Sequence, residues 1–377
     1  MSVVNIRTKP VFKLNQPDDS YKAQPLPVPF GVYPYRLKPE INDSTAEKLV
    51  FHVVGDTGGI KSPAFQRLIA NEMAKQYHNA AKEEDKPSFL YHVGDIVYHF
   101  GEANQYEQQF FTPYKNYPAP IYAIPGNHDS DVNPSAEQPY KSLDAFTSVF
   151  CGAKPRNVPF GDDKERKSGI QPHVYWTLQA PMANIIGLYS NVPKFGMIDE
   201  EQKAWFIEEL RNAAKEKAEK AIIVCVHHAP YTADINHGSS LPMITFMEEC
   251  FNSAGVRPDL VLSGHVHNYQ RYKKLYPDGS SVSFIVCGGG GFDELHKLAD
   301  PDDLNFSDES KLFDNVSLKR SCVMQHGFLR LEVEKKGGEL TINGGYYAIP
   351  HQGLQDGEDA PLYEHFEIEL NRDLVVG

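Results

Sequence analysis

Polar side chains that could bind a metal ion follow five separate apolar runs of the chain. They stand in Gly55-Asp56, Gly94-Asp95, Gly126-Asn127-His128-Asp129, His227-His228 and Gly264-His265-Val266-His267. With one nearby tyrosine, the ligand-type residues are Asp56, Asp95, Tyr98, Asn127, His228, His265 and His267. Mixed nitrogen and oxygen donors suit borderline and hard metals such as Fe, Zn and Mn. Seven ligands are too many for one tetrahedral site, but with one bridging carboxylate they would serve two adjacent metals.

Each cluster also has a simpler interpretation. A Gly-Asp pair alone is most often a turn or a helix cap. The two histidines of GHVH are a stronger signal, because alternate residues of a strand point the same way. The occurrence of all five clusters together, rather than any one of them, favours a metal site.

The apolar runs predict the elements that position these residues. Buried strands are predicted at 49–56 and 88–95 and in PIYAIPGNHD, with helical segments between them. This βαβαβ order predicts a parallel sheet. Further predicted elements are a two-strand meander in VYWTLQA and ANIIGLYSN, a helix at 199–220, strands in AIIVCVHHAP, DLVLSGHVH and SVSFIVC, a helix ended by Gly255, and a hairpin around Lys336-Gly337-Gly338. The polar clusters then lie at the carboxyl ends of strands, where open α/β sheets bind ligands.

The blocks GDTG (55–58), GDIVY (94–98), GNHD (126–129), VCVHHAP (224–230) and GHVH (264–267) resemble those of the calcineurin-like metallophosphoesterases, and more narrowly of the purple acid phosphatases. The resemblance spans roughly residues 48–295. The broader family usually begins with Asp-x-His, but Gly58 stands at that His position. Tyr98 stands where the purple subgroup supplies a phenolate. The implied fold class is α/β, a four-layer α/β/β/α sandwich of two mixed β-sheets flanked by helices.

The resemblance also implies two ligand sets. The first metal would take Asp56, Asp95, Tyr98 and His267, and the second Asn127, His228 and His265, with Asp95 bridging. Because a tyrosinate needs a strong Lewis acid, Fe(III) is expected at the first site, with Fe(II), Zn(II) or Mn(II) at the second. The implied enzyme is an acid phosphatase-like hydrolase of phosphomonoesters that works by in-line attack of a metal-bound hydroxide.

The fourth block contains two histidines. A Val-x-x-His pattern through Val224 selects His227, whereas the family's His-x-Pro tail selects His228. Strand alternation points the two rings to opposite faces, so only one should bind. We prefer His228 and expect His227 to be a buried, hydrogen-bonded histidine.

Three more residues have expected roles in catalysis. The resemblance places His128 outside the ligand sets, facing the phosphate and the leaving-group oxygen. Asp129 would orient His128, as a carboxylate fixes an imidazole tautomer. His237, nine residues after His228, is a second candidate for substrate contact or general acid, although a loop histidine is often only solvated.

The composition of the whole chain argues against some classes of binding partner. The chain has 377 residues and a formal net charge of -13, which argues against general affinity for nucleic acids or anionic membranes. No apolar run reaches the roughly 20 residues of a membrane span, and no signal peptide is evident. Five widely spaced cysteines fit reduced, buried thiols, so we expect a cytoplasmic protein whose partner is a phosphorylated small molecule or another phosphoester.

We expect residues 1–46 to form a Pro-rich extended segment, and residues 47–377 to form one catalytic domain that includes the C-terminal hairpin. The run Gly288–Gly291 has no following Lys-Ser or Lys-Thr, so it indicates close backbone approach rather than a P-loop. Two alternative functions remain: phosphodiester or nucleotide hydrolysis on the same metals, and a non-catalytic scaffold of this fold.

Overall fold

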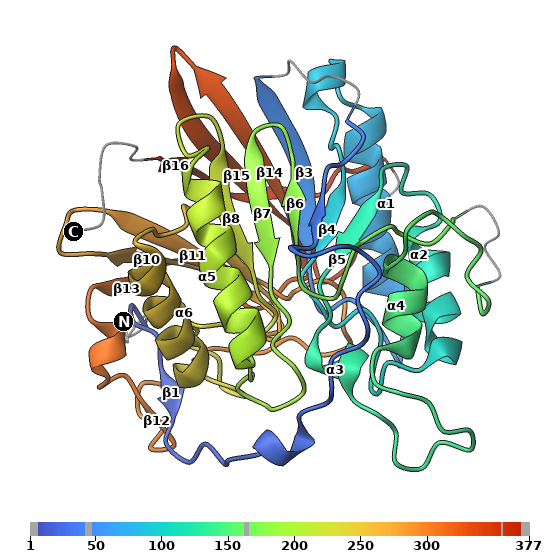
Figure 1. Cartoon of the computed structure of the whole chain (residues 1–377), viewed down its shortest axis with the longest axis horizontal. Helices are drawn as coiled ribbons and strands as arrows, with labels where there is room; N and C mark the ends of the chain where they lie inside the picture. The colour runs from blue at the N-terminus through green and yellow to red at the C-terminus, as the bar shows by residue number, and fades with distance from the viewer. Residues whose placement is uncertain (1–6, 42–46, 162–165, 356, 371–377) are drawn as a thin grey trace.

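Two mixed β-sheets pack against each other, with helices on their outer sides (Figure 1). The structure is a computed structural model that describes residues 7–41, 47–161, 166–355 and 357–370. Residues 1–6 and 42–46 of the predicted N-terminal segment, and 371–377 of the predicted domain, lie outside the described residues. The predicted α/β class and its arrangement as two mixed sheets flanked by helices are confirmed.

The six-stranded sheet contains the parallel strands predicted from the first three apolar runs. Its order is β16 (Leu362–Glu369), β15 (Glu339–Ala348), β14 (Gly327–Lys336), β3 (Lys48–Val54), β4 (Leu90–His92) and β5 (Ile121–Ala123). β3, β4 and β5 pair in parallel, as predicted. β14 and β15 form the predicted hairpin, with Lys336 opposite Glu339. All residues of β3 after Lys48 are buried, as expected of a strand covered on both faces.

The eight-stranded sheet combines the predicted meander with three further parallel strands. Its order is β13 (Val316–Cys322), β10 (Tyr269–Leu275), β11 (Ser281–Cys287), β9 (Leu260–Ser263), β8 (Ala221–Cys225), β7 (Ala183–Gly187), β6 (Trp176–Gln179) and β2 (Arg36–Leu37). β6 and β7 are antiparallel, as the meander requires. The pairs β7–β8, β8–β9 and β9–β11 are parallel.

Aromatic side chains from both sheets meet in the core between them. Trp176 of β6 stacks on Tyr91 of β4, with ring centroids 6.1 Å apart, and lies 5.6 Å from the ring of Tyr122 in β5. The Trp176 indole N–H donates to the carbonyl oxygen of Ala123, at 3.2 Å. These contacts tie the strands that end at the polar clusters to the opposite sheet.

Two of the longer helices begin at a capping side chain, and one of them ends at the predicted glycine. α5 (Glu200–Ala214) follows Asp199, whose side chain accepts the N–H of Gln202; it ends six residues before the predicted end at 220. α6 (Leu241–Ala254) ends at Gly255, which has a φ of +69°, as predicted. The remaining helices are α1 (Ala64–His78), α2 (Thr112–Tyr114), α3 (Asn127–Ser130), α4 (Asp144–Phe150), the 3₁₀ turns η1 (Ser20–Lys22), η2 (Glu83–Asp85), η3 (Ala103–Gln105) and η5 (Lys311–Phe313), and the π turn η4 (Glu107–Phe111).

The described part of the N-terminal segment lies along the body of the molecule rather than apart from it (Figure 1). β1 (Phe12–Lys13) pairs with β12 (Phe306–Ser307), and β2 forms the edge of the eight-stranded sheet. Val11 donates its N–H to the carbonyl oxygen of Thr232 (2.9 Å) and accepts the N–H of Ser239 (2.7 Å). The segment therefore holds the loop that follows β8.

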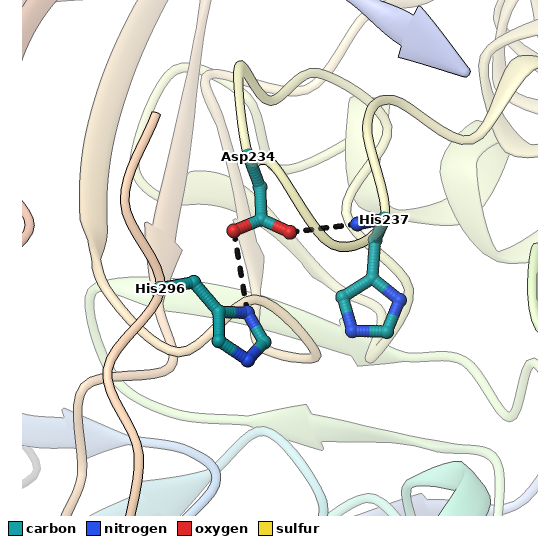
Figure 2. A group of neighbouring side chains, drawn as sticks. All are labelled: Asp234, His237 and His296. Atoms are coloured by element: carbon teal, nitrogen blue, oxygen red, sulfur yellow. Dashed lines mark hydrogen bonds and ion pairs between the residues drawn. The ribbon is translucent and has the colours of Figure 1, made fainter. Parts of the chain in front are cut away.

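Two loops far apart in sequence run side by side near the polar clusters (Figure 2). The loop after β8 donates the N–H of Ile235 to the carbonyl oxygen of Lys297, at 3.1 Å. The loop after β11 donates the N–H of Ala299 to the carbonyl oxygen of Ala233, at 2.8 Å. Asp234 and His296 face each other across this contact.

Two other predictions from composition concern the described residues. All five cysteines are buried and form no disulfide, as predicted for reduced thiols. In the described ranges, none of the helices has the length and apolar character of a membrane span.

The aromatic contact between the sheets yields a stability prediction. We expect Trp176→Ala to lower the free energy of unfolding by about 3–5 kcal/mol, because it leaves a cavity and removes the indole hydrogen bond to the Ala123 carbonyl oxygen. Urea denaturation followed by circular dichroism measures this change. Leu304→Ala, at a side chain that is 89% exposed, is the control and should change it by less than about 0.5 kcal/mol. Equal effects of the two changes would contradict the packing role of Trp176.

Candidate metal centre

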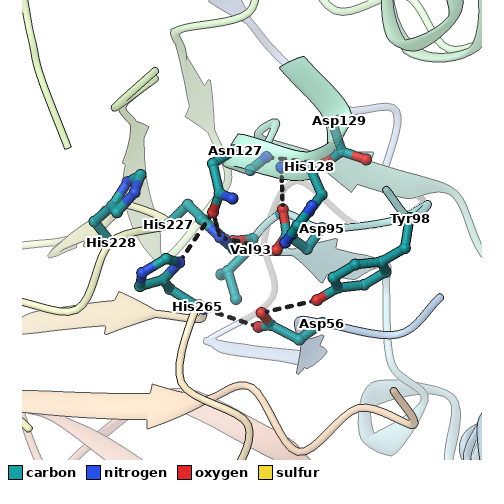
Figure 3. Close-up of polar contacts among 12 residues, drawn as sticks. Asp56, Val93, Asp95, Tyr98, Asn127, His128, Asp129, His227, His228 and His265 are labelled. Atoms are coloured by element: carbon teal, nitrogen blue, oxygen red, sulfur yellow. Dashed lines mark hydrogen bonds and ion pairs between the residues drawn. The ribbon is translucent and has the colours of Figure 1, made fainter. Parts of the chain in front are cut away.

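The segments that follow β3, β4, β5, β8 and β9 meet at one end of the two sheets (Figure 3). His265, after β9, donates its backbone N–H to Asp56 Oδ2, after β3, at 2.9 Å. His227, after β8, has its Nδ1 2.9 Å from the carbonyl oxygen of Val93, after β4. The site therefore lies where the ends of both sheets converge.

Three of the predicted ligands have left-handed backbone conformations. The φ angles are +56° at Asp56, +54° at Asp95 and +67° at His265. This region is uncommon for residues with a side chain and costs of order 1–3 kcal/mol at each position. Strain of this kind persists where the surrounding structure imposes it, most often at functional sites.

His227, rather than His228, lies among the predicted ligands. Its Nε2 is 3.1 Å from Asn127 Oδ1 and 3.3 Å from Asp95 Oδ2. Possible ligand atoms of Asp56, Asp95 and His227 all lie within 4.8 Å of one another. Because the Nδ1 of His227 faces a carbonyl oxygen, it carries the hydrogen there, and in the neutral ring the Nε2 lone pair points at two oxygen acceptors.

His228 points in a different direction. Its Nδ1 is 2.7 Å from the Ser190 hydroxyl, and its Nε2 is buried without a hydrogen bond. Its ring lies 4.3 Å from the ring of His265, so it is adjacent to the site. The geometry thus reverses our preference between the two histidines: the rings do diverge, but His227 is the one that faces the carboxylates.

His265 completes this first group of donors. Its Nδ1 lies 2.9 Å from Asn127 Oδ1, the same oxygen that faces His227. Burial, with the neighbouring His237, lowers the pKa of His265 well below its ordinary value, so the ring is neutral. An amide oxygen, a carboxylate oxygen and two imidazole nitrogens therefore converge, which is the arrangement that a cation would satisfy.

A second group of donors surrounds Tyr98. The Tyr98 hydroxyl lies 3.3 Å from both Asp56 Oδ1 and His267 Nε2. His267 Nδ1 faces the carbonyl oxygen of Glu294 at 3.0 Å, so its Nε2 lone pair is directed toward Asp56 and Tyr98. Asp56 and Asp95 link this group to the first one.

The absence of a histidine at position 58 has a steric reason. A Cβ at Gly58 would overlap the side-chain oxygen of Gln109 and lie 3.0 Å from the Tyr98 ring. Gln109 accepts the N–H of Tyr98 (2.9 Å) and donates to its carbonyl oxygen (3.1 Å). Tyr98 and Gln109 thus fill the place of the missing side chain, and the sequence analysis did not single out Gln109.

The glycine run after β11 approaches the site closely, as we expected. A Cβ at Gly288 would lie 2.7 Å from Asp56 Oδ2. Only glycine lets this backbone pack against the carboxylate.

The pKa shifts in the site show that added positive charge would stabilise its buried carboxylates. Burial raises the pKa of Asp56 well above its ordinary value, and Asp95 adds to this against the opposing effect of His227. Burial also lowers the pKa of His227, but Asp95 and Asp56 raise it more, to about 9. Burial, Asp95 and Asp56 raise the pKa of Tyr98 well above its ordinary value. A metal ion would supply the missing charge and reverse these shifts.

His128 and Asp129 do not interact as we expected. The Asp129 carboxylate is buried and accepts three backbone N–H groups, from Ile96 (2.9 Å), Val97 (3.1 Å) and Gly126 (2.8 Å). Burial, with Asp95, raises its pKa to about 7. The described contacts include none between Asp129 and the His128 ring. Asp129 therefore joins the loops after β4 and β5, because these loops present unpaired N–H groups to it.

His128 is positioned by backbone atoms instead. Its N–H donates to Asp95 Oδ1 at 2.9 Å, and its Nδ1 lies 2.9 Å from the carbonyl oxygen of His99. Its ring is partly exposed and lies 4.5 Å from the ring of Tyr98. The neutral ring then has its Nε2 lone pair free.

His237 lies beside the site, but with partners that the sequence analysis missed. Its ring is 4.2 Å from that of His265. Possible ligand atoms of Asp234, His237 and His296 lie within 4.8 Å of one another. No spacing in the sequence links Asp234 to His296, because their loops meet only in the folded chain.

Comparison with known proteins agrees with this geometry. A sequence model of the family described as calcineurin-like phosphoesterase matches residues 49–269. The chain is 28% identical over 193 residues to purple acid phosphatase 15 of Arabidopsis thaliana, covering 49% of this chain and 32% of that protein. It is 38% identical over 160 residues to an uncharacterized protein of Mycobacterium tuberculosis, covering 40% of this chain and 27% of that protein. The matches thus span about a third or less of these relatives' lengths.

Two solved structures share the fold at 14% sequence identity. GAP50, described as the anchor in the inner membrane complex of Plasmodium, has a TM-score of 0.55, with 86% of this chain and 89% of that chain covered. PhoD has a TM-score of 0.52, and the match covers 92% of this chain and 72% of the PhoD chain.

The divergence of His227 and His228 yields a prediction about metal affinity. We expect His227→Ala to weaken Zn²⁺ binding by more than about 100-fold, beyond the roughly 10–100-fold effect of losing an outer partner of a ligand. His228→Ala should stay within that smaller range, because its ring lies outside the converging donors. Competition with a chromophoric chelator measures both affinities. Loss of Zn²⁺ in His228→Ala with retention in His227→Ala would contradict the geometry.

Proposed function

Because the chain belongs to the calcineurin-like phosphoesterase family, we propose that it is a metal-dependent phosphatase that hydrolyses phosphomonoesters. The observation that carries the proposal is the convergence of possible ligand atoms on two adjacent places, with the carboxylate of Asp95 between them. The similarity to a plant purple acid phosphatase supports the monoester substrate class.

The residues present fit two metal ions. One would be held by Asp56, Asp95, Tyr98 and His267, and the other by Asp95, Asn127, His227 and His265, with Asp95 shared. This set differs from the expected one only in having His227 in place of His228. When bound, the ions would neutralise the phosphoryl oxygens and lower the pKa of a water molecule.

Tyr98 favours Fe(III) for the first ion. Burial and two nearby carboxylates raise the pKa of its hydroxyl, so only a strongly polarising cation would hold it as a phenolate. The second set is neutral except for Asp95, which suits a divalent ion such as Fe(II), Zn(II) or Mn(II).

His128 would act on the substrate rather than on the metals. The His99 carbonyl oxygen holds its Nδ1–H, which leaves Nε2 to contact a phosphoryl oxygen or, when protonated, to donate a proton to the leaving group. Asp129 would support it indirectly by fixing the two loops from which Asp95 and Asn127 project. His237 faces Asp234 and His296 and receives no general-acid role here.

The scaffold alternative has one observation behind it. GAP50, which shares this fold, is described as an anchor, so the fold alone does not establish catalysis. The converging donors favour the enzyme, because a scaffold has no need to bury two carboxylates beside a group of imidazoles. Phosphodiester hydrolysis would use the same metal chemistry. Comparing the turnover of a monoester with that of a diester distinguishes the two activities.

We expect turnover of p-nitrophenyl phosphate in the presence of Fe and Zn²⁺ to exceed that of the bis-ester. His128→Ala should bind both metals yet lower kcat by about 10²–10⁴-fold, since it removes an acid–base group only. Steady-state kinetics with metal analysis of each preparation measures this. His78→Ala, at an exposed histidine of α1, should match the wild type.

Three results would decide against parts of this proposal. Fully metallated wild-type protein with no turnover of either ester would support the scaffold. Preference for the bis-ester would support the diesterase. Full activity of His128→Ala would remove His128 from the reaction.

Tyr98 yields a spectroscopic prediction. Protein loaded with Fe(III) should show a broad visible absorption band from tyrosinate-to-iron charge transfer, and Tyr98→Phe should abolish it while keeping the fold. Tyr346→Phe, which alters another buried tyrosine with an unpaired hydroxyl, is the matched control and should keep the band. A colourless Fe(III) form of the wild type, or colour in Tyr98→Phe, would refute the phenolate ligand.

A further inference from the structure

A second group of donor atoms lies outside the two proposed metal sites. It consists of Asp234 and His237 from the loop after β8 and His296 from the loop after β11 (Figure 2). One possible ligand atom of each lies within 4.8 Å of the other two. None of these residues belongs to the ligand sets proposed above.

Two of the atoms that face each other in this group have no hydrogen-bond partner. Asp234 is fully buried, and its Oδ2 accepts the backbone N–H groups of Asn236 and His237, each at 2.8 Å. Its Oδ1 makes no hydrogen bond, although His296 Nδ1 lies 3.2 Å away. The Nδ1 of His296 is also buried and unpaired, and His237 turns its Nε2 side toward the other two residues (Figure 2). Leaving buried polar atoms unpaired is unfavourable, so each such group needs an explanation.

Backbone contacts hold these side chains in place. Besides the pairing of their two loops, His296 donates its N–H to the carbonyl oxygen of His267 (2.9 Å) and accepts from the Asn268 amide (2.9 Å). Gly238, next to His237, pairs with Phe12 of the N-terminal segment. The three donors are therefore brought together by independent parts of the fold, and they cannot separate without breaking these contacts.

An ion pair between Asp234 and a protonated His296 would explain only part of this arrangement. It would not explain why a ring nitrogen of His237 lies within 4.8 Å of ligand atoms of both other residues. A cation bound by all three residues would pair Asp234 Oδ1 and His296 Nδ1 and would also use His237. Two imidazole nitrogens and one carboxylate oxygen form a ligand set that proteins use for Zn²⁺ and other borderline divalent ions, with positions left for water or substrate.

We propose that Asp234, His237 and His296 bind a third cation, Zn²⁺ or a similar divalent ion, beside the two-metal centre. The ring of His296 stacks on that of His267 at 4.2 Å, and the ring of His237 lies 4.2 Å from that of His265. The third ion would thus lie on the outer side of two ligand histidines. From there it adds positive charge next to the place where an anionic phosphoester binds.

The test is the number of Zn²⁺ ions bound by the full chain after chelator treatment and reloading with Zn²⁺ alone. Native mass spectrometry and elemental analysis count them, and circular dichroism checks that each variant is folded. We expect three ions in the wild type and two in His296→Gln. Asp234→Asn should also bind two, because its amide oxygen can still accept the two backbone N–H groups while its NH₂ replaces Oδ1.

Two controls separate this site from the others. His326→Gln changes a buried histidine whose Nδ1 is also unpaired but whose ring packs against Phe65. This variant should keep three ions. Asp95→Asn should lose ions of the two-metal centre but keep the one bound by Asp234. Two ions in the wild type and an unchanged count in folded His296→Gln and Asp234→Asn would overturn the proposal. A protein that binds three ions but hydrolyses no phosphoester would overturn the proposed function and leave this site standing.

Discussion

Asp56 and Asp95 are buried next to each other, and the ring of His227 is the titratable group that faces Asp95, at 3.3 Å. Two carboxylates without counter-charge are unstable in a protein interior. In the metal-free chain, the raised pKa of His227 lets a proton supply part of that charge. Metal ions would do so more completely, so the same atoms that are unfavourable on their own would suit bound metal ions.

The surrounding structure maintains this unfavourable arrangement. Left-handed backbone at Asp56, Asp95 and His265 turns each side chain inward directly after its strand. Asp129 joins two of the loops through three backbone N–H groups, and Gln109 holds the backbone of Tyr98 from both sides. The aromatic contacts between the sheets then fix the strand ends relative to one another. The rigidity of the fold thus carries the strain that the site requires.

The sequence predicted what depends on local pattern and failed where tertiary contacts decide. Buried runs followed by polar clusters were enough for the parallel strands and the neighbourhood of the donors, whereas the two-sheet fold came from the family resemblance. Alternation showed that His227 and His228 diverge, but not which ring faces Asp95, since that depends on how β8 sits against β4. The partners of Asp129 and the meeting of Asp234 with His296 arise between segments distant in sequence, and no spacing rule encodes them.

Charge explains how so acidic a chain could act on an anionic substrate. The net charge of -13 would repel a phosphoester at long range. In the proposed centre, two carboxylates and one phenolate oppose a trivalent and a divalent ion, so the ligands do not cancel the positive charge of the metals. A third cation held by Asp234, with neutral His237 and His296, would add to the excess. The local field at the strand ends is then opposite in sign to that of the whole molecule, and it is this local field that a phosphoryl group meets on binding.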